Sequence, residues 1–170
     1  EEIVSTKPLS GGSISSAYLI NTTKSKYFLK VNSAPDALKM FHEEQRGLNA
    51  IESTKTIAVP HVYFVDIHNQ NAFIVMDYIE SKRPSPSDYK RLGNELAKLH
   101  KVSFNEFGFS SDNFIGSLPQ SNKKHDSWSD FYWNERIYPQ LQLALNAGLL
   151  SAEEVPNEDQ FISLFNSYID

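Results

Sequence analysis

The chain of 170 residues contains no cysteine, which excludes disulfide bonds and thiolate metal sites within it. It also lacks any apolar run near the ~20 residues of a membrane-spanning helix, so we expect no membrane partner. The opening residues Glu1–Lys7 have neither the basic region nor the apolar segment of a signal peptide. A cytoplasmic protein is the simplest interpretation of these absences.

A surplus of basic residues is missing too. The 16 Lys and Arg residues are outnumbered by 21 Asp and Glu residues, which gives a formal net charge of −5. Proteins that bind nucleic acids without sequence preference depend on basic patches, so we expect no nucleic-acid partner. Hydrophobic residues make up 40% of the chain and charged residues 22%, as is typical of soluble globular proteins.

Several catalytic motifs are also absent from the sequence. There is no Gly-x-x-x-x-Gly-Lys-Ser/Thr phosphate loop, no Gly-x-Ser-x-Gly elbow and no His-Glu-x-x-His motif. The five histidines are scattered, without carboxylates at ligand spacing. Walker-type nucleotide binding, serine-hydrolase chemistry and a histidine metal centre therefore have no support in the sequence.

A glycine turn between two β-prone runs is the most informative feature that is present. Gly11, Gly12 and Ser13 follow the run Ile3–Leu9 and precede the run Ala17–Ile20. Glycine has no Cβ, so backbone N–H groups in such a turn can approach an anion closely. We therefore predict a site for the phosphates of a nucleotide, although an ordinary hairpin turn would explain the glycines alone.

The periodicity of the first eighty residues predicts a five-stranded antiparallel sheet with one helix packed on it, an α+β arrangement. Ser33 and Asp36 fit a capping box at the start of this helix, and we expect its end near Ser53 and Thr54. The expected strands cover residues 3–9, 17–20, 27–31, 61–67 and 72–79, and the helix lies between the third and fourth of them.

The polar segment 81–87, which contains two prolines, is predicted to be a hinge between a lobe of residues 1–80 and a mainly helical lobe of residues 88–170. In the second lobe, Ser85 with Asp88 and Ser127 with Asp130 predict helix starts.

Residues 103–126 show neither a helical nor an alternating period, so we expect a long ordered loop. Pro139 should kink or split the helix that it lies in, and Gly148 is a plausible end for that helix. The last apolar stripe predicts a helix still running near Asp170.

Lys30 lies inside an apolar strand, and Glu44 lies on the helix that follows it. Each feature has a simpler explanation when it is taken alone. Lys30 could be an edge lysine, Glu44 could be a solvated acid with Glu43 as a competitor, and Met76 could be a core residue. The order of strand, glycine turn, strand with lysine, helix with glutamate, strand and hinge is nevertheless the order of parts in protein kinases.

The sequence resembles the fructosamine kinases (ketosamine-3-kinases) over most of its length. In the first lobe the resemblance lies in the glycine turn, in the strand that ends at Lys30 and in the strand before the hinge. In the second lobe it lies in a more specific series: Phe107-Gly108-Phe109, Asp112-Asn113-Phe114-Ile115-Gly116, Pro119-Gln120-Ser121-Asn122, and Trp128 with Phe131 and Arg136.

The resemblance implies a protein-kinase-like fold that transfers the γ-phosphoryl group of ATP, with Mg²⁺, to a sugar hydroxyl of a small or protein-linked ketosamine. It implies that the glycine turn covers the phosphates, that Lys30 contacts them and that Glu44 orients Lys30. The strand end of Met76, Asp77, Tyr78 and Ile79 would present its backbone to adenine. The signature loop, whose residues are Asn113, Gln120, Asn122 and Trp128, would either contact the substrate or hold its own lobe together.

Two departures from the family pattern are visible. Ser13 stands where some members carry a cysteine, and the His-Gly-Asp-Leu-Trp segment with its later metal-binding aspartate is absent. We therefore expect no catalytic base and no metal ligand in this chain, and no turnover by it alone. Alternatives are a non-catalytic nucleotide-binding module and an aminoglycoside- or choline-type phosphotransferase, although the signature loop argues against the latter.

Overall fold

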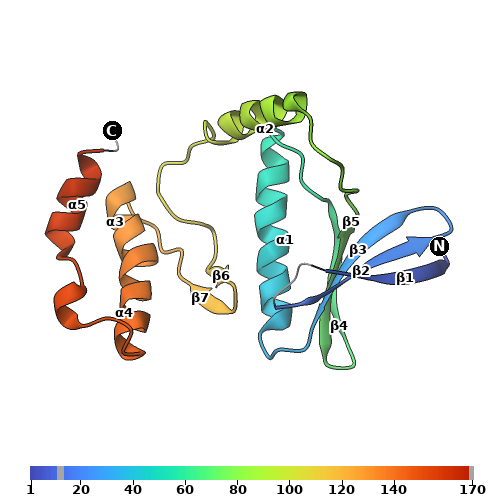
Figure 1. The fold of residues 1–170 in the computed structure, drawn as a ribbon, viewed down its shortest axis with the longest axis horizontal. Helices are drawn as coiled ribbons and strands as arrows, with labels where there is room; N and C mark the ends of the chain where they lie inside the picture. The colour runs from blue at the N-terminus through green and yellow to red at the C-terminus, as the bar shows by residue number, and fades with distance from the viewer. Residues whose placement is uncertain (11–13, 169–170) are drawn as a thin grey trace. The chain divides into compact units, whose positions relative to one another are not determined.

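The computed structural model describes residues 1–10 and 14–168. The chain divides into two compact units, Glu1–Ser103 and Phe104–Asp170, which Figure 1 shows as ribbons. Among the described residues, no helix combines the length and the hydrophobicity needed to cross a membrane.

The first unit contains the predicted five-stranded sheet. Every neighbouring pair of strands is antiparallel, and the spatial order is β1-β2-β3-β5-β4. The predicted α+β architecture is therefore confirmed, with the helix between the third and fourth strands. The elements are β1 (Ile3–Leu9), β2 (Ser16–Thr22), β3 (Lys26–Asn32), α1 (Ala37–Thr54), β4 (Val62–His68) and β5 (Asn71–Asp77).

The core of this unit lies between α1 and one face of the sheet. Alternate residues of a strand share a face, so Ala72, Ile74 and Met76 of β5 all point toward the helix and are buried. Phe41 of α1 packs among them with 2% of its surface exposed, and Ile74 has none exposed. This packing fixes α1 against the strands that carry the candidate site.

The start of α1 differs from the prediction. Asp36 is the N-cap residue, but its side chain makes no capping hydrogen bond, so the capping box expected from Ser33 and Asp36 is wrong. Instead, the Asn32 side-chain oxygen accepts a hydrogen bond of 2.8 Å from the Ala34 backbone N–H. Asparagine commonly bonds to the backbone two residues ahead, and this local turn directs the chain into the helix.

Residues 78–85 have no regular secondary structure and connect β5 to α2 (Pro86–Leu99). The predicted capping box of α2 is confirmed, because the Asp88 carboxylate accepts a hydrogen bond of 2.9 Å from the Ser85 backbone N–H. Hydrogen bonds from Lys82 and from Ser85 hold the pKa of Asp88 well below its usual range. Helix α2 belongs to the first compact unit, Glu1–Ser103. The boundary between the two units therefore lies beyond residues 81–87, and the hinge over these residues stays a prediction.

The second unit contains a small hairpin, β6 (Asn113–Ile115) with β7 (Leu118–Gln120). It corrects the expectation of an unbroken loop over residues 103–126, because three-residue strands are too short for alternation to be visible. Helical segments follow the hairpin: α3 (Trp128–Tyr132), a π-helical segment η1 (Trp133–Ile137), α4 (Tyr138–Asn146), a short 3₁₀ turn η2 (Ala152–Glu154) and α5 (Glu158–Asn166).

Pro139 lies in the first turn of α4, directly after the π-helical segment, so the expected split of this helix is confirmed. Proline has no backbone N–H to continue the preceding hydrogen-bond ladder. Gly148 has a φ of +67° just beyond α4, as expected of a helix terminator. The last helix, α5, ends at Asn166, which corrects the expectation of a helix running near Asp170.

Aromatic rings form the core of the second unit. Trp133 is 3% exposed, and its ring centroid lies 4.9 Å from that of Phe161. Phe165 stacks on Tyr132 with a centroid distance of 5.2 Å. Two residues of the predicted apolar stripe on α5 therefore pack against α3 and η1, whereas Leu164 on the same helix is 61% exposed.

We expect Ile74→Ala to lower the free energy of unfolding by about 2 to 5 kcal/mol, because it leaves a cavity at the centre of the α1–sheet core. The control is Ile67→Ala on the neighbouring strand, where the side chain is 52% exposed and the loss should be much smaller. Urea unfolding followed by circular dichroism measures both. Equal losses would contradict the position assigned to this core.

Candidate functional site

Lys30 lies near the middle of β3, opposite Ala17 of β2 and Ile74 of β5. Its ammonium donates a hydrogen bond of 2.5 Å to a Glu44 carboxylate oxygen on α1. The side chains are 26% and 32% exposed, so the pair lies at the edge of the core and is still open to solvent. The structure therefore brings together the two residues that were predicted to meet.

Glu43, the competing acid on α1, has a different environment. It is 9% exposed, and its carboxylate lies 3.4 Å from Arg46, one helical turn away. Successive residues of a helix point in directions about 100° apart, so only one of two adjacent acids can meet β3. The packing of α1 on the sheet gives this contact to Glu44.

A ring completes the surroundings of the lysine. The Lys30 nitrogen lies 5.6 Å from the centroid of the Phe41 ring, within the range of a cation–π contact. Phe41 belongs to the core, and it lies one helical turn before Glu44. The ammonium is thus held from α1 by a carboxylate and an aromatic ring, and both depend on the packing of this helix.

The predicted phosphate turn of Gly11, Gly12 and Ser13 lies outside the described residues. Ser15 directly precedes β2 in the chain, and its hydroxyl accepts a hydrogen bond of 3.3 Å from the Asn32 side chain. The beginning of β2 is therefore tied to the end of β3.

The strand end predicted to meet adenine is divided between the core and the surface. The Met76 side chain is 4% exposed and contributes to the core, as the simpler explanation held. Ile79 is 65% exposed. The Asp77 carboxylate accepts hydrogen bonds of 2.7 Å from the Tyr63 hydroxyl and 2.9 Å from the His61 backbone N–H. The Asp77 side chain is therefore engaged by β4 and the residue before it.

These bonds change the acidity of both side chains. The hydrogen bond from Tyr63, and after it the one from His61, lowers the pKa of Asp77 below its ordinary value of 3.8. The same interaction with Asp77 raises the pKa of Tyr63. A carboxylate with a lowered native pKa stabilises the fold above its unfolded pKa and loses that effect as the pH falls through the native value.

We expect Asp77→Asn to lower the free energy of unfolding at pH 7 by about 1 kcal/mol, because the charge-assisted bonds become neutral ones. The difference from wild type should begin to shrink below about pH 4, where Asp77 becomes protonated in the unfolded chain, and it should continue to shrink as the pH falls toward the lower pKa of the native carboxyl. Urea unfolding at pH 7, 5 and 3 measures it. A difference that stays constant down to pH 3 would contradict the lowered pKa.

The signature loop of the second unit is held by Asn122, which is 4% exposed. Its backbone N–H donates to the Asp112 carboxylate at 2.8 Å, and its side-chain amide donates to the Ser111 carbonyl at 2.9 Å. Its side-chain oxygen accepts from Arg136. All of these partners lie within the unit, so the role of Asn122 in this structure is to hold the loop.

Arg136 on η1 joins this loop to the helices. Its guanidinium donates to the Ser121 carbonyl at 2.7 Å and to the Glu135 carbonyl at 2.8 Å, in addition to Asn122. It also lies 4.6 Å from the centroid of the buried Phe131 ring. Burial lowers the pKa of Arg136, although the Glu135 carboxylate acts in the opposite direction.

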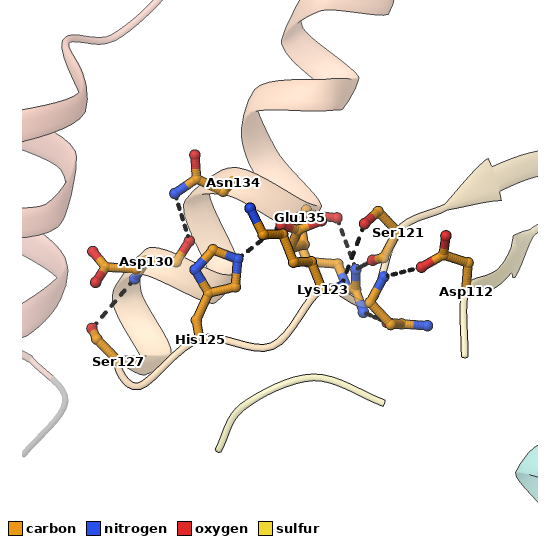
Figure 2. Close-up of polar contacts among 10 residues, drawn as sticks. Asp112, Ser121, Lys123, His125, Ser127, Asp130, Asn134 and Glu135 are labelled. Atoms are coloured by element: carbon orange, nitrogen blue, oxygen red, sulfur yellow. Dashed lines mark hydrogen bonds and ion pairs between the residues drawn. The ribbon is translucent and has the colours of Figure 1, made fainter. Parts of the chain in front are cut away.

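Glu135 and His125 form a second link between loop and helix, which the sequence did not indicate. The His125 imidazole lies 2.8 Å from the Glu135 carboxylate, and Glu135 is 8% exposed (Figure 2). Burial alone would raise the pKa of Glu135, but hydrogen bonds with Ser121 and His125 bring the pKa below its ordinary value. The π-helical turn carries both Glu135 and Arg136, and such turns often occur at functional sites.

Gly108 shows why this loop needs a glycine. Its φ is +134°, and a Cβ at this position would lie 2.8 Å from the Asn122 carbonyl oxygen. Both the backbone conformation and the lack of space exclude other residues. The Phe-Gly-Phe run is thus fitted to the loop that Asn122 holds.

The other three signature residues differ in accessibility. Asn113 pairs with Gln120 in the hairpin, and the Asn113 side-chain oxygen is buried without a hydrogen-bond partner among the described residues. Trp128 is 38% exposed and packs on Phe107 with a centroid distance of 5.6 Å. Trp128 therefore has surface that a ligand could reach.

Arg136→Lys should lower the free energy of unfolding by about 2 kcal/mol, because one ammonium nitrogen cannot reach the acceptors that the Nη1 and Nη2 atoms of Arg136 contact separately. The control is Arg91→Lys, where the side chain is 67% exposed and its ion pairs with Asp88 and Glu95 are solvated. Chemical denaturation monitored by tryptophan fluorescence measures both changes. Equal, small changes would contradict the anchoring role of Arg136.

The described residues of the first unit include a cation, Lys30, that a carboxylate holds in place. Within residues 1–10 and 14–168, no group of three or more His, Asp or Glu side chains could hold a metal ion. A nucleotide could thus be contacted through Lys30 by charge and through the strand end after Met76 by backbone groups.

Comparison with known proteins gives one family. A family model described as fructosamine kinase matches residues 1–168. A Vibrio parahaemolyticus protein named "Probable ketoamine kinase" is 39% identical over 143 residues, which cover 83% of this chain and 49% of that protein. A chloroplastic protein-ribulosamine 3-kinase of Oryza sativa subsp. japonica is 37% identical over 145 residues, which cover 84% of this chain and 42% of the rice protein.

Solved structures agree on the fold. One is the crystal structure of a Haemophilus somnus protein named "Putative fructosamine-3-kinase", with a TM-score of 0.81 at 25% identity. The match covers 95% of this chain and 53% of the Haemophilus chain. Aminoglycoside phosphotransferase APH(4)-Ia has a TM-score of 0.53 at 15% identity, which shows the protein-kinase-like fold alone. The chain spans about half the length of curated relatives that it matches, 49% in one and 47% in another.

Proposed function

This chain belongs to the fructosamine kinase family, and we propose that it supplies the ATP-binding part of an enzyme that phosphorylates ketosamines. Membership implies ATP binding, because the family is one of kinases. The proposed acceptor is a sugar hydroxyl of a ketosamine, either free or linked to a protein. Its basis is the names of the relatives, ketoamine kinase and protein-ribulosamine 3-kinase.

The observation that carries this proposal is the contact between Lys30 and Glu44. A lysine on a central strand, 26% exposed and bonded at 2.5 Å to a helix carboxylate, is a cation held in one place at the edge of a core. An ammonium in this setting fits the negative charge of a triphosphate. The role proposed for Lys30 is to bind and orient the phosphates, and the role proposed for Glu44 is to hold Lys30.

Backbone recognition of adenine is proposed for Asp77, Tyr78 and Ile79. The Asp77 carboxylate is occupied by Tyr63 and His61, so this side chain does not compete with a base for the backbone groups beside it. Tyr78 and Ile79 follow the last residue of β5 and lie outside the ladder of that strand. The proposed roles of Gly11, Gly12 and Ser13 at the phosphates rest on the family resemblance.

Mg²⁺ is proposed as the second cofactor, since phosphoryl transfer needs a metal to neutralise the phosphate charge. ATP supplies the transferred phosphoryl group when it is bound. About half the length of the relatives lies outside the region matched here, and we assign the catalytic base and the metal ligands to that half. The described residues accordingly receive binding and orienting roles only.

For the signature loop we propose that Asn122 and Trp128 have different roles. Asn122 holds the loop through three partners within its unit, so it is not proposed to touch a substrate. The Trp128 side chain is 38% exposed, and its proposed role is to lie against the acceptor sugar. This loop also disfavours an aminoglycoside or choline acceptor, because its motif belongs to the fructosamine kinase pattern.

In any form of the protein that turns over, Lys30→Met should lower kcat/KM for ATP by about 100-fold, because the phosphates lose a positioned charge. It should also weaken MgATP binding by this chain in isothermal titration calorimetry. Lys24→Met, in the exposed turn between β2 and β3, is the control and should leave both unchanged. Equal ATP affinity of Lys30→Met and wild type would refute the proposed phosphate role.

A further inference from the structure

We propose that Asn32 is a positioning residue that holds α1 in the orientation needed for Glu44 to meet Lys30. The inference deepens the proposed function and rests on it for the consequence for ATP. The contact itself, between Lys30 and Glu44, can be tested without a nucleotide. Asn32 was not among the residues that the sequence indicated.

Asn32 is the last residue of β3, at the point where the chain leaves the sheet. It is 8% exposed, and both ends of its side-chain amide are bonded. The oxygen accepts from the Ala34 backbone N–H at 2.8 Å, and the nitrogen donates to the Ser15 hydroxyl at 3.3 Å. A buried amide bonded at both ends has one orientation, because any other would leave polar groups unsatisfied.

These two bonds connect three parts of the candidate site. Asn32 and Lys30 are two residues apart on one strand, so their side chains lie on the same face of the sheet. Ala34 belongs to the turn that leads into α1, and Ser15 directly precedes β2. One side chain therefore ties the turn that leaves β3 to the start of β2, the strand that pairs with Lys30 through Ala17.

The direction of α1 matters because Glu44 lies about two turns into the helix. A small rotation at the start of a helix becomes a displacement of its side chains at that distance. Asp36 makes no side-chain capping bond that could fix this start instead. The bond between Asn32 and Ala34 is thus the side-chain interaction that sets the turn into α1.

A second Asn–Ser pair in the same sheet provides a matched control. The Asn21 side chain donates to the Ser5 hydroxyl at 3.0 Å, across β1 and β2, and this pair is exposed. It has the same chemistry as the Asn32–Ser15 pair but no bond to the turn before α1. A general need for Asn–Ser bonds in the sheet would make both pairs matter equally.

The first experiment measures the Lys30–Glu44 contact directly. The protein is treated briefly with an amine-acylating reagent, and the modification of Lys30 is followed by mass spectrometry. An ammonium held against Glu44 is less accessible to the reagent than a free one, so Asn32→Ala should speed the labelling of Lys30 about threefold to tenfold, toward the rate of Glu44→Ala. Ser15→Ala should cause a smaller increase, and Asn21→Ala none.

Lys24 is exposed in the folded chain, so its labelling in the same samples reports on the reagent dose and its rate should stay constant, while circular dichroism of each variant reports on general unfolding. Unchanged labelling of Lys30 in both Asn32→Ala and Ser15→Ala would overturn the inference. So would a labelling increase in Asn21→Ala of the same size, since the effect would then belong to the sheet as a whole.

The second experiment measures the MgATP dissociation constant by calorimetry. Asn32→Ala should raise it about threefold to tenfold in the wild-type background and hardly at all in the Glu44→Ala background, because the effect acts through Glu44. A residue with only a structural role would give equal effects in both backgrounds, which would overturn the inference. If Lys30 labelling responds as expected but the wild-type protein binds no ATP, the positioning role stands and the proposed function fails.

Discussion

The contact between a strand lysine and a helix glutamate depends on the packing of α1 against the sheet. Lys30 and Glu44 are separated along the chain, and their 2.5 Å contact exists because Phe41 and Ile74 are buried beneath it. Apolar burial is non-directional, and hydrogen bonds add the orientation. The hydrophobic core brings the two elements together, and polar contacts decide which charged side chains meet at its edge.

In the second unit, side-chain hydrogen bonds hold a loop in place. This signature loop has little regular structure, so its backbone groups need partners from elsewhere. Arg136 and Asn122 supply them, and Glu135 with His125 adds a second connection. The π-helical turn of η1 places Glu135 and Arg136 in adjacent positions where both reach the loop. Much of the family signature in this unit is therefore explained by the need to hold the loop.

The two units contribute differently to the proposed kinase. The first unit contains Lys30, whose ammonium is bonded to Glu44, and the end of β5. These features suit the proposed binding of the phosphates and the base of a nucleotide. The second unit presents a held loop with Trp128 at its surface. Similarity to ketoamine kinases extends over most of the chain and includes both units, and the fold shared with an aminoglycoside phosphotransferase indicates a common kinase-like architecture.

The sequence by itself determined the five strands, the helix between them, the start of α2 and the break at Pro139, because periodicity, caps and proline act locally. It also indicated Lys30 and Glu44 through the order of elements. Only the tertiary structure decided that Glu44 and not Glu43 meets the lysine, that Asn32 and not Ser33 sets the start of α1, and that Asn122 is held inside its loop. The contacts of Glu44 and Asn122 join residues distant along the chain, and the local bond of Asn32 to Ala34 is accompanied by a distant one to Ser15. Distant contacts follow from packing, which no local pattern contains.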